Sequence, residues 1–355
     1  MTDLLALAAE LVDIPSVSFE EAQIADHLEA ELVGMPWLAV DRIGDNLVAR
    51  TELGRPYRLV LAGHTDTVPP DANLGARIEG DLLYGLGSCD MKGSLAAMLE
   101  LARTVEDPAV DLTYVFYARE EVASHHSGLA EIERSDASLL AGDAALLGEP
   151  TSAGIEAGCQ GVLRARLTLL GARAHTARPW MGSNAIHRLA PLLERLDAYQ
   201  PRCPVIDGCE YREAVQAVWV EGGVAGNVVP DEAVVTVSHR FAPDRTPAQA
   251  STALADVVGE VDGFEVTDAV AGAPPSLAHP LLSALIDRNH LPVAAKLGWT
   301  DVAFFASRDV PAANFGAGDA TIAHTRGEHV TRRDIETVYA ALADLVTRGA
   351  HDRTL

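Results

Sequence analysis

Histidine and acidic side chains follow the apolar runs of this sequence and one turn-rich stretch. They are His64 and Asp66 after residues 57–63, Asp90 after the turn-rich stretch 84–89, Glu120 and Glu121 after 112–118, Glu149 after 144–148, and His324 after 310–319. Singly, each has an ordinary structural explanation, such as a helix cap for Asp90 or a solvated pair for the two glutamates. Together they indicate a shared metal site, because several carboxylates held close together are very unfavourable without a cation.

A pair of divalent cations would satisfy this set of side chains. Two imidazoles with three or four carboxylate oxygens suit zinc better than calcium or magnesium, and cobalt or manganese could replace zinc. If one carboxylate is shared, the set can hold two ions about 3.5 to 4 Å apart. The residues therefore predict a two-metal site that could hydrolyse an amide.

The adjacent glutamates and Asp66 have separate parts in this chemistry. Because Glu120 and Glu121 point in different directions from one strand end, one can bind a metal while the other takes the proton from the attacking water. Asp66, two residues after His64, is expected to accept the second N–H of that imidazole and to fix its tautomer.

Competing catalytic motifs fail in this sequence. The stretch GLGSCD has aspartate where a dinucleotide-binding G-x-G-x-x-G requires its last glycine, and neither G-x-S-x-G nor H-E-x-x-H occurs. The neighbouring His125 and His126 stand in a polar loop, and we expect neither to bind a metal.

The elements that must position the site have the pattern of an α/β domain. Residues 57–63, 112–118 and 144–148 look like buried strands, and residues 91–105 and 332–348 have helical spacing. This alternation predicts a sheet with helices on both faces, whose ligands lie beyond the carboxyl ends of the strands.

The middle of the chain has a different pattern of polar and apolar residues. From about residue 162, long strands with alternating polar and apolar residues replace the buried runs, and a helix is expected around 183–197. We therefore expect an inserted α+β domain over 162–272, within a catalytic domain formed by 1–161 and 273–355.

Composition limits the classes of partner. The chain has 355 residues with a formal net charge of −24, which makes nucleic acid and anionic membranes unfavourable partners. The sequence has no uncharged stretch long enough to span a bilayer, and its start does not resemble a signal peptide. Its four cysteines form no C-x-x-C pair, so we expect reduced thiols and a cytoplasmic location.

Five segments of the sequence resemble a known family. GHTDTVP, GLGSCDMKG, REE, GEPT and AHTRGE look like the metal-site segments of the M20 metallopeptidase family, in the same order and over nearly the whole chain. The resemblance implies a zinc-aminopeptidase-like catalytic domain with two zinc ions, and an inserted domain that forms a homodimer.

The same resemblance implies a role for each matching residue. The metal ligands would be His64 and Glu149 on one zinc, Glu121 and His324 on the other, and Asp90 bridging them. Glu120 would be the general base, and Asp66 would support His64. His175 of the inserted domain would reach the partner subunit's site and stabilise the oxyanion.

Expected substrate contacts come from other matching strings. Asn227 in GNVVPD, Arg240 in HRFAP and Thr300 in KLGWTD match positions where the family meets its substrate, and Arg178 is a further cation that could attract an anionic substrate.

The longest matching strings, such as GEPTSAGIEAGCQG and GARAHTARPWMGSNAIH, imply a small N-acyl amino acid substrate, in particular N-succinyl-L,L-2,6-diaminopimelate. One departure leaves an alternative open. Phe304 stands where relatives commonly have arginine, so a deacylase for acetylornithine or for other N-acyl amino acids is the second possibility.

Overall fold

The chain divides into two compact units in a computed structural model that describes residues 2–350. Unit 1 is drawn from Met1–Ala157, Pro275–Ala294 and Phe304–Leu355, and unit 2 from Gly158–Pro274 and Ala295–Ala303.

Segment 295–303 groups with unit 2, although it lies inside the predicted catalytic range of 273–355, whose last five residues lie outside the described part. This segment belongs to unit 2 because it is hydrogen-bonded there. Gln160 Nε2 donates to the backbone oxygen of Leu297 at 2.9 Å, and Trp299 Nε1 donates to that of Ala271 at 3.2 Å. The predicted insert boundaries at 162 and 272 lie within a few residues of those of unit 2.

A mixed sheet forms the centre of unit 1. In the described residues it has eight strands in the order β1 (Ala39–Ile43), β2 (Asn46–Arg50), β6 (Asp111–Tyr117), β3 (Arg58–His64), β7 (Ala144–Leu147), β16 (Ala312–Asn314), β8 (Ile155–Ala157) and β15 (Val293–Ala295). Strand β3 runs parallel to β6 and β7, and β7 runs parallel to β16. The predicted strands at 57–63, 112–118 and 144–148 are confirmed as β3, β6 and β7. Their sequences are nearly unbroken apolar runs because both faces of each strand are buried.

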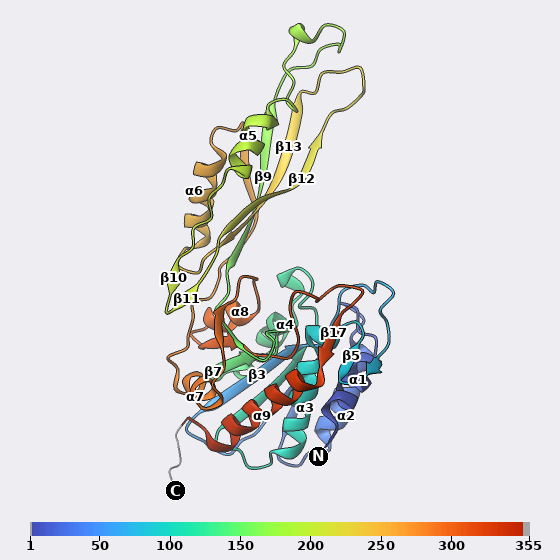
Figure 1. Cartoon of the computed structure of the whole chain (residues 1–355), viewed down its shortest axis with the longest axis vertical. Helices are drawn as coiled ribbons and strands as arrows, with labels where there is room; N and C mark the ends of the chain where they lie inside the picture. The colour runs from blue at the N-terminus through green and yellow to red at the C-terminus, as the bar shows by residue number, and fades with distance from the viewer. Residues whose placement is uncertain (1, 351–355) are drawn as a thin grey trace. The chain divides into compact units, whose positions relative to one another are not determined.

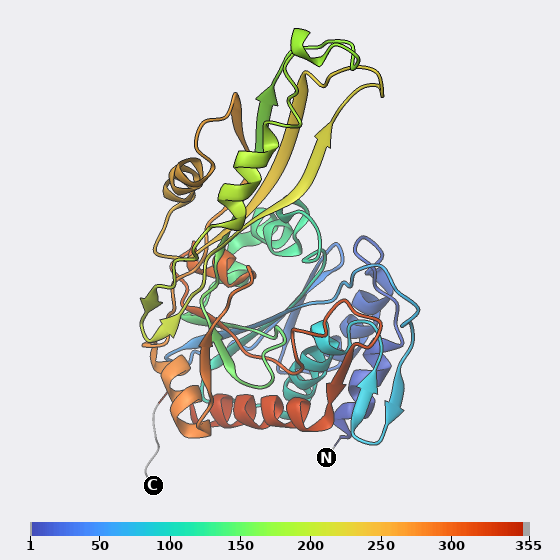
Figure 2. The ribbon, with the colours of Figure 1, turned by 45° about the horizontal axis from the view of Figure 1, so that its top comes forward.

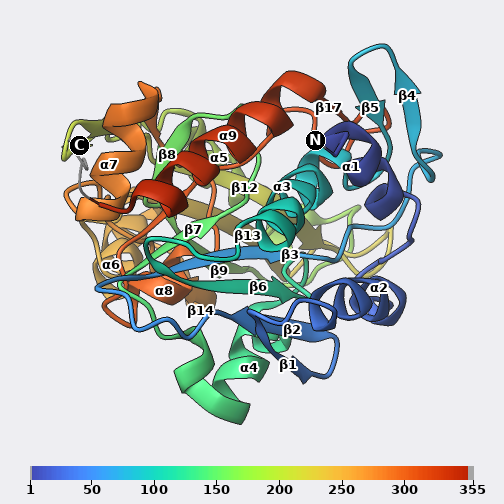
Figure 3. The same cartoon turned by 90° about the horizontal axis from the view of Figure 1, so that it is seen from below.

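Helices cover the two faces of this sheet (Figure 3). Those that share one core with it are α1 (Leu4–Val12), α2 (Ala22–Val33), α3 (Gly93–Thr104), α7 (Pro280–Asn289) and α9 (Arg332–Arg348). Helix α4 (Gly128–Asp136) lies on the other side, and α8 (Val302–Ala306) is a short helix. Between residues 2 and 350, no helix combines the length and the apolar composition that crossing a bilayer requires.

Helix α9 illustrates how the sequence specifies these elements. Thr331 caps its start by accepting the N–H of Asp334 at 3.0 Å, and Ile335, Val338 and Leu342 bury one stripe at spacings of three and four. The predicted helix at 332–348 is confirmed.

A smaller sheet and several short turns complete unit 1. The sheet has the order β17 (His329–Thr331), β5 (Leu82–Tyr84) and β4 (Arg77–Glu79). Short helical turns of the chain cover Ser88–Lys92, Ser124–His126, Ala137–Leu140 and, in unit 2, Pro179–Met181.

Unit 2 is an antiparallel sheet with helices on one face (Figures 1 and 2). Its strand order is β12 (Ala214–Gly222), β13 (Glu232–Phe241), β9 (Gly161–Leu170) and β14 (Gly263–Val270). Alternate residues of β13 are buried against α5 (Leu189–Asp197) and α6 (Pro247–Val258), so the expected alternation of polar and apolar residues in this strand is confirmed. A short hairpin pairs β10 (Val205–Ile206) with β11 (Cys209–Glu210).

Candidate metal centre

The carboxyl ends of three parallel strands bring the predicted residues to one edge of the sheet in unit 1. His64 is the last residue of β3 and pairs in register with Tyr117 at the end of β6. Glu120 and Glu121 follow β6, and Glu149 follows β7, which is parallel to β3. The prediction that these side chains share one edge of the sheet is confirmed.

Glycines let the loop that carries Asp90 approach this edge. A Cβ atom on Gly63 would lie 2.7 Å from Cε of Met91, and one on Gly148 would lie 2.4 Å from the same atom. The residues that directly precede His64 and Glu149 must therefore be small for Met91, and with it Asp90, to pack here.

Asp90 lies between two imidazoles. One of its oxygens, Oδ1, is 3.0 Å from Nε2 of His64, and the other, Oδ2, is 3.4 Å from Nε2 of His324. The same nitrogen of His324 is 2.7 Å from Oε1 of Glu121. A carboxylate that offers one oxygen to each side has the arrangement of a bridging ligand.

The donor atoms fit a divalent cation. Ligand atoms of His64, Asp90 and Glu121 all lie within 4.8 Å of one another, and a borderline-soft ion such as zinc accepts this mixture of imidazole and carboxylate. His64 is 1% exposed, whereas the side chain of His324 is 46% exposed. One side of the centre is thus sealed and the other is open.

Protonation of the histidines balances the carboxylates in the metal-free protein. Burial opposes charge on His64, but its interactions with the nearby carboxylates of Asp66 and Asp90 outweigh burial and hold its pKa well above the usual 6.5. Hydrogen bonds to Asp90 and Glu121 raise the pKa of His324 to about 10. Although burial acts in the opposite direction, hydrogen bonds from the two histidines hold the pKa of Asp90 below its usual range. Positive charge is stabilised where a cation would bind, so a metal ion must displace these protons.

Asp66 has a broader role than the one expected from the sequence. Nδ1 of His64 is 3.0 Å from the backbone oxygen of Asp66 and 3.6 Å from its carboxylate, so the backbone oxygen is the nearer acceptor. The buried carboxylate instead accepts the N–H of Glu120 at 2.9 Å, the N–H of Glu121 at 3.1 Å and the hydroxyl of Ser18 at 2.7 Å. Asp66 therefore fixes the backbone of both glutamates.

The remaining predicted residues of this unit lie at the same edge. Glu149 is buried, and Glu120 is half-buried. Their expected roles as ligand and base stay predictions. The rings of His125 and His126 contact each other at an inclined angle in an exposed loop, with 3.9 Å between ring centroids. The cluster of possible ligand atoms found in residues 2–350 does not include them.

The sequence profile of peptidase family M20/M25/M40 matches residues 60–348. The chain belongs to this family.

Relatives in the M20 family are similar over nearly their whole length. A succinyl-diaminopimelate desuccinylase of Corynebacterium glutamicum is 44% identical over 351 residues, which cover 96% of this chain and 95% of the relative. A protein of Mycobacterium tuberculosis that carries the same name provisionally is 49% identical over 348 residues, covering 98% of this chain and 97% of the relative.

Solved structures of other proteins share the fold. A tripeptidase from Staphylococcus aureus superposes with a TM-score of 0.78 at 21% identity, covering 98% of both chains. A dinuclear metal-binding M20 peptidase from Bacillus subtilis superposes with a TM-score of 0.68 at 15% identity, covering 97% of this chain and 96% of that one.

Unit 2 of this M20 protein carries its candidate residues in two separate groups. His175, Arg178 and Asn227 meet in loops beyond the amino end of β13, where the N–H of Thr176 donates to the backbone oxygen of Asn227 at 3.1 Å. Arg240 lies near the carboxyl end of β13, paired in register with Val162. Because β13 has ten residues, the two groups are about 30 Å apart.

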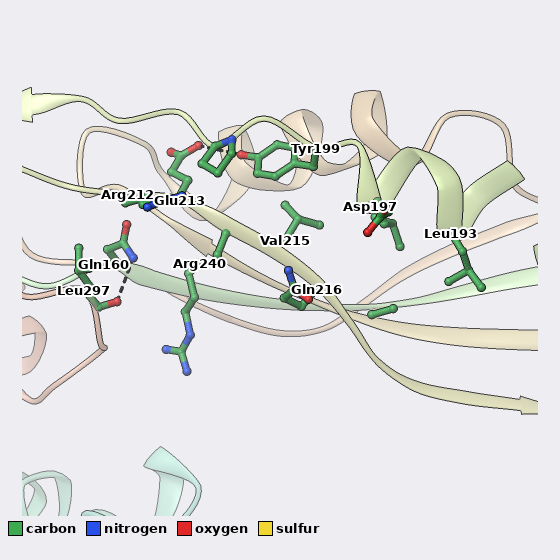
Figure 4. Close-up of a pocket in the computed structure, with 14 residues that line it drawn as sticks. Gln160, Leu193, Asp197, Tyr199, Arg212, Glu213, Val215, Gln216, Arg240 and Leu297 are labelled. Carbon is green, nitrogen blue, oxygen red and sulfur yellow. Dashed lines mark hydrogen bonds between the residues drawn. The ribbon is translucent and has the colours of Figure 1, made fainter. Parts of the chain in front are cut away.

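The base of unit 2 contains a pocket of about 680 Å³ (Figure 4). Arg240 and Gln160 are among its lining residues, and the guanidinium of Arg240 points away from Tyr199 and Glu213. Arg240 has no acidic partner in the described part of the chain, unlike Arg202 and Arg245, which pair with Glu213. Thr300, also in unit 2, is buried, and its backbone oxygen lies 3.7 Å from Sγ of Cys159.

Two buried charged residues beside the centre were missed by the sequence reasoning. Glu328 accepts backbone N–H groups of the Asp90 loop, and burial raises its pKa to about 7. Nζ of Lys92 donates to the backbone oxygen of Ile14 at 2.7 Å, and burial lowers its pKa to about 7. Both stand in the matching segments GLGSCDMKG and AHTRGE, which is the signal that could have drawn attention to them.

Proposed function

We propose that this M20 protein is a two-metal amidohydrolase that cleaves N-succinyl-L,L-2,6-diaminopimelate to succinate and L,L-diaminopimelate. The placement of Asp90 between His64 and His324, with Glu121 beside them, is the observation that carries the hydrolase assignment. The substrate rests on the near full-length similarity to the desuccinylase of Corynebacterium glutamicum.

Two cations would share the centre. His64 and Glu149 would hold one ion, Glu121 and His324 the other, and Asp90 both; zinc is the expected metal, with cobalt or manganese as substitutes. Bound there, the ions would lower the pKa of a water molecule and polarise the scissile carbonyl group.

Glu120 would move the proton. In the proposed reaction its carboxylate accepts a proton as the oxygen of the attacking water bonds to the carbonyl carbon. It then delivers this proton to the amide nitrogen, so that the C–N bond breaks and the amine leaves. The hydrogen bond from its N–H to Asp66 fixes the backbone from which it acts. Oε1 of Glu121 lies 2.7 Å from Nε2 of His324, which supports a role as metal ligand for Glu121 and leaves the role of base to Glu120.

His175 would stabilise the oxyanion as a neutral hydrogen-bond donor. Its Nδ1 accepts the N–H of Ala177 at 3.0 Å, which leaves the proton on Nε2, where the exposed ring can donate it. Because His175 and Arg240 are about 30 Å apart along β13, one small substrate cannot contact both within one chain. If both act on the same substrate, one of them comes from a partner subunit.

An exposed edge strand supports a homodimer. Strand β12 is at one end of the sheet order, and three consecutive apolar residues on it, Val218, Trp219 and Val220, are 54%, 63% and 53% exposed. An unpaired edge with apolar side chains favours association with another strand. We therefore propose β12 as part of the dimer interface.

Recognition of the succinyl carboxylate would fall to arginines of unit 2. Arg240 lacks an acidic partner among the described residues, and Arg178 is exposed, so both cations are available to an anion. Phe304 cannot serve in this way, and its ring is covered by the guanidinium of Arg308, whose Cζ lies 3.5 Å from the ring centroid. Arg308 is itself paired with Glu133. The lack of a cation at position 304 that could bind a succinyl carboxylate favours the second candidate, a deacylase for acetylornithine or another N-acyl amino acid.

A substrate comparison tests the proposal. Metal-depleted protein should be inactive, and zinc should restore hydrolysis of N-succinyl-L,L-2,6-diaminopimelate with a kcat/KM well above that for N-acetylornithine. The reverse preference would favour the second candidate. Failure of zinc, cobalt and manganese to restore any amide hydrolysis would exclude the two-metal mechanism.

A further inference from the structure

Glu328 is a buried acid that joins two loops of the metal centre. It follows His324 by four residues and directly precedes β17, and it is 1% exposed. Its Oε1 accepts the backbone N–H of Cys89 at 3.1 Å and that of Asp90 at 3.2 Å. A residue from the His324 loop thus holds the backbone of the bridging aspartate.

Backbone hydrogen bonds fix Glu328 itself. Its N–H donates to the backbone oxygen of Thr325 at 3.1 Å, and its own backbone oxygen accepts the N–H of Gly85 at 3.2 Å. The residue is therefore tied to the loop after His324 and to the segment that leads into Asp90. Because the backbone N–H and the backbone oxygen of Glu328 are both hydrogen-bonded, the length of its side chain sets the distance between these loops.

We infer that Glu328 is a positioning residue of the metal centre, which aims the two oxygens of Asp90 at the two imidazoles by accepting the backbone N–H groups of Cys89 and Asp90. The inference rests on the proposed metal centre and adds a residue that would not touch metal or substrate. It predicts that metal affinity depends on the position of one acceptor oxygen.

A purely stabilising role explains this carboxylate less well. Oε2 of Glu328 has no hydrogen-bond partner in residues 2–350, and burying a carboxyl group with one unpaired oxygen is unfavourable. The two bonds at Oε1 instead orient the one residue that lies between both imidazoles. Partners that orient metal ligands typically change metal affinity by about 10–100-fold when they are removed.

Three variants separate the acceptor oxygen from the charge. Glu328→Gln keeps the length and one acceptor oxygen but loses the charge. Glu328→Asp keeps the charge, but its oxygens are withdrawn by one methylene, too far to accept N–H groups that are 3.1 and 3.2 Å from the present oxygen. Glu328→Ala removes both properties.

Asp111→Ala is the matched control. Asp111 is also a buried carboxylate that accepts two backbone N–H groups, from Leu53 at 2.8 Å and Arg55 at 2.7 Å. It begins β6, at the end of the strand opposite to Glu120 and Glu121. Its loss should lower stability through comparable hydrogen bonds without reaching the centre.

The test measures zinc dissociation constants by competition with a chromophoric chelator, together with the visible spectrum of cobalt-substituted protein. We expect Glu328→Gln to stay within about threefold of the wild type, and Glu328→Asp and Glu328→Ala to weaken zinc binding by about 10–100-fold with an altered cobalt spectrum. Asp111→Ala should keep the wild-type affinity and spectrum.

Specific outcomes would overturn the inference. Glu328→Asp that binds zinc as tightly as Glu328→Gln, or more tightly, would show that the position of the acceptor oxygen does not set the metal affinity. Unchanged affinity in a folded Glu328→Ala, or equal losses in Asp111→Ala, would leave only a structural role. If Glu328→Ala does not fold, the comparison of the Gln and Asp variants decides alone. Wild-type protein that binds no zinc would instead refute the proposed function.

Discussion

Replacing Asp66 by asparagine tests how the two glutamates are held. The carboxylate of Asp66 accepts three hydrogen bonds, from the N–H of Glu120 to Oδ1 and from the N–H of Glu121 and the hydroxyl of Ser18 to Oδ2. An amide has one acceptor oxygen and an NH₂ group that cannot accept. The least costly orientation places the NH₂ group at the Oδ2 position, because the Ser18 hydroxyl can rotate and become the acceptor.

In that orientation the N–H of Glu121 loses its acceptor, and the bond to the N–H of Glu120 loses its charge assistance. One lost hydrogen bond to a charged group is worth about 1.5–3 kcal/mol, and the unpaired donor adds to this when it is buried. We therefore expect Asp66→Asn to lower the free energy of unfolding by about 2–3 kcal/mol. Because both glutamates would be less well placed, kcat/KM should fall by about 10–100-fold.

Thermal unfolding of the metal-free protein and steady-state kinetics of the zinc form would measure the two effects. Ser18→Ala is the control, because it removes a hydroxyl from the same carboxylate but leaves both backbone bonds. Its kcat/KM should stay within about threefold of the wild type, since the bonds that place Glu120 remain. An Asp66→Asn protein as active as the wild type, or a Ser18→Ala protein as impaired as Asp66→Asn, would refute the reasoning.

Three further predictions address the base, the histidines and the dimer. Glu120→Gln should lower kcat by about 10²–10⁴-fold while metal analysis finds the zinc content unchanged, and full activity would rule out Glu120 as the base. In metal-free protein the stabilisation from His324 should be complete below pH 6.5, its usual pKa, and should be lost as pH rises through about 10; unfolding midpoints should fall across this window, and a flat profile would contradict the raised pKa. Trp219→Glu should shift the protein from dimer to monomer in sedimentation velocity, and an unchanged dimer would place the interface elsewhere.

The site in unit 1 was largely predictable because strand order decides it. Buried apolar runs identify β3, β6 and β7, and parallel strands deliver the residues that follow them to one edge of the sheet. The sequence alone therefore groups His64 with Glu121.

What the sequence did not specify depends on contacts between distant segments. Nothing local to Asp66 indicates that its carboxylate accepts the N–H groups of Glu120 and Glu121, more than fifty residues away. Glu328 accepts the N–H of Asp90 across an even longer separation in the sequence. Segment 295–303 groups with unit 2, where side chains such as Gln160 hydrogen-bond to it, and its own sequence does not indicate these partners. Short strands such as β8 and β15 carry too few residues to show a period.

The length of β13 has a genetic consequence if the active sites are shared between subunits. A chain damaged at His175 would then impair its neighbour, while a chain damaged at Glu120 would impair the site that it builds itself. Co-expressed in one cell, two such inactive alleles would complement each other, since mixed pairs would contain one site assembled entirely from intact parts.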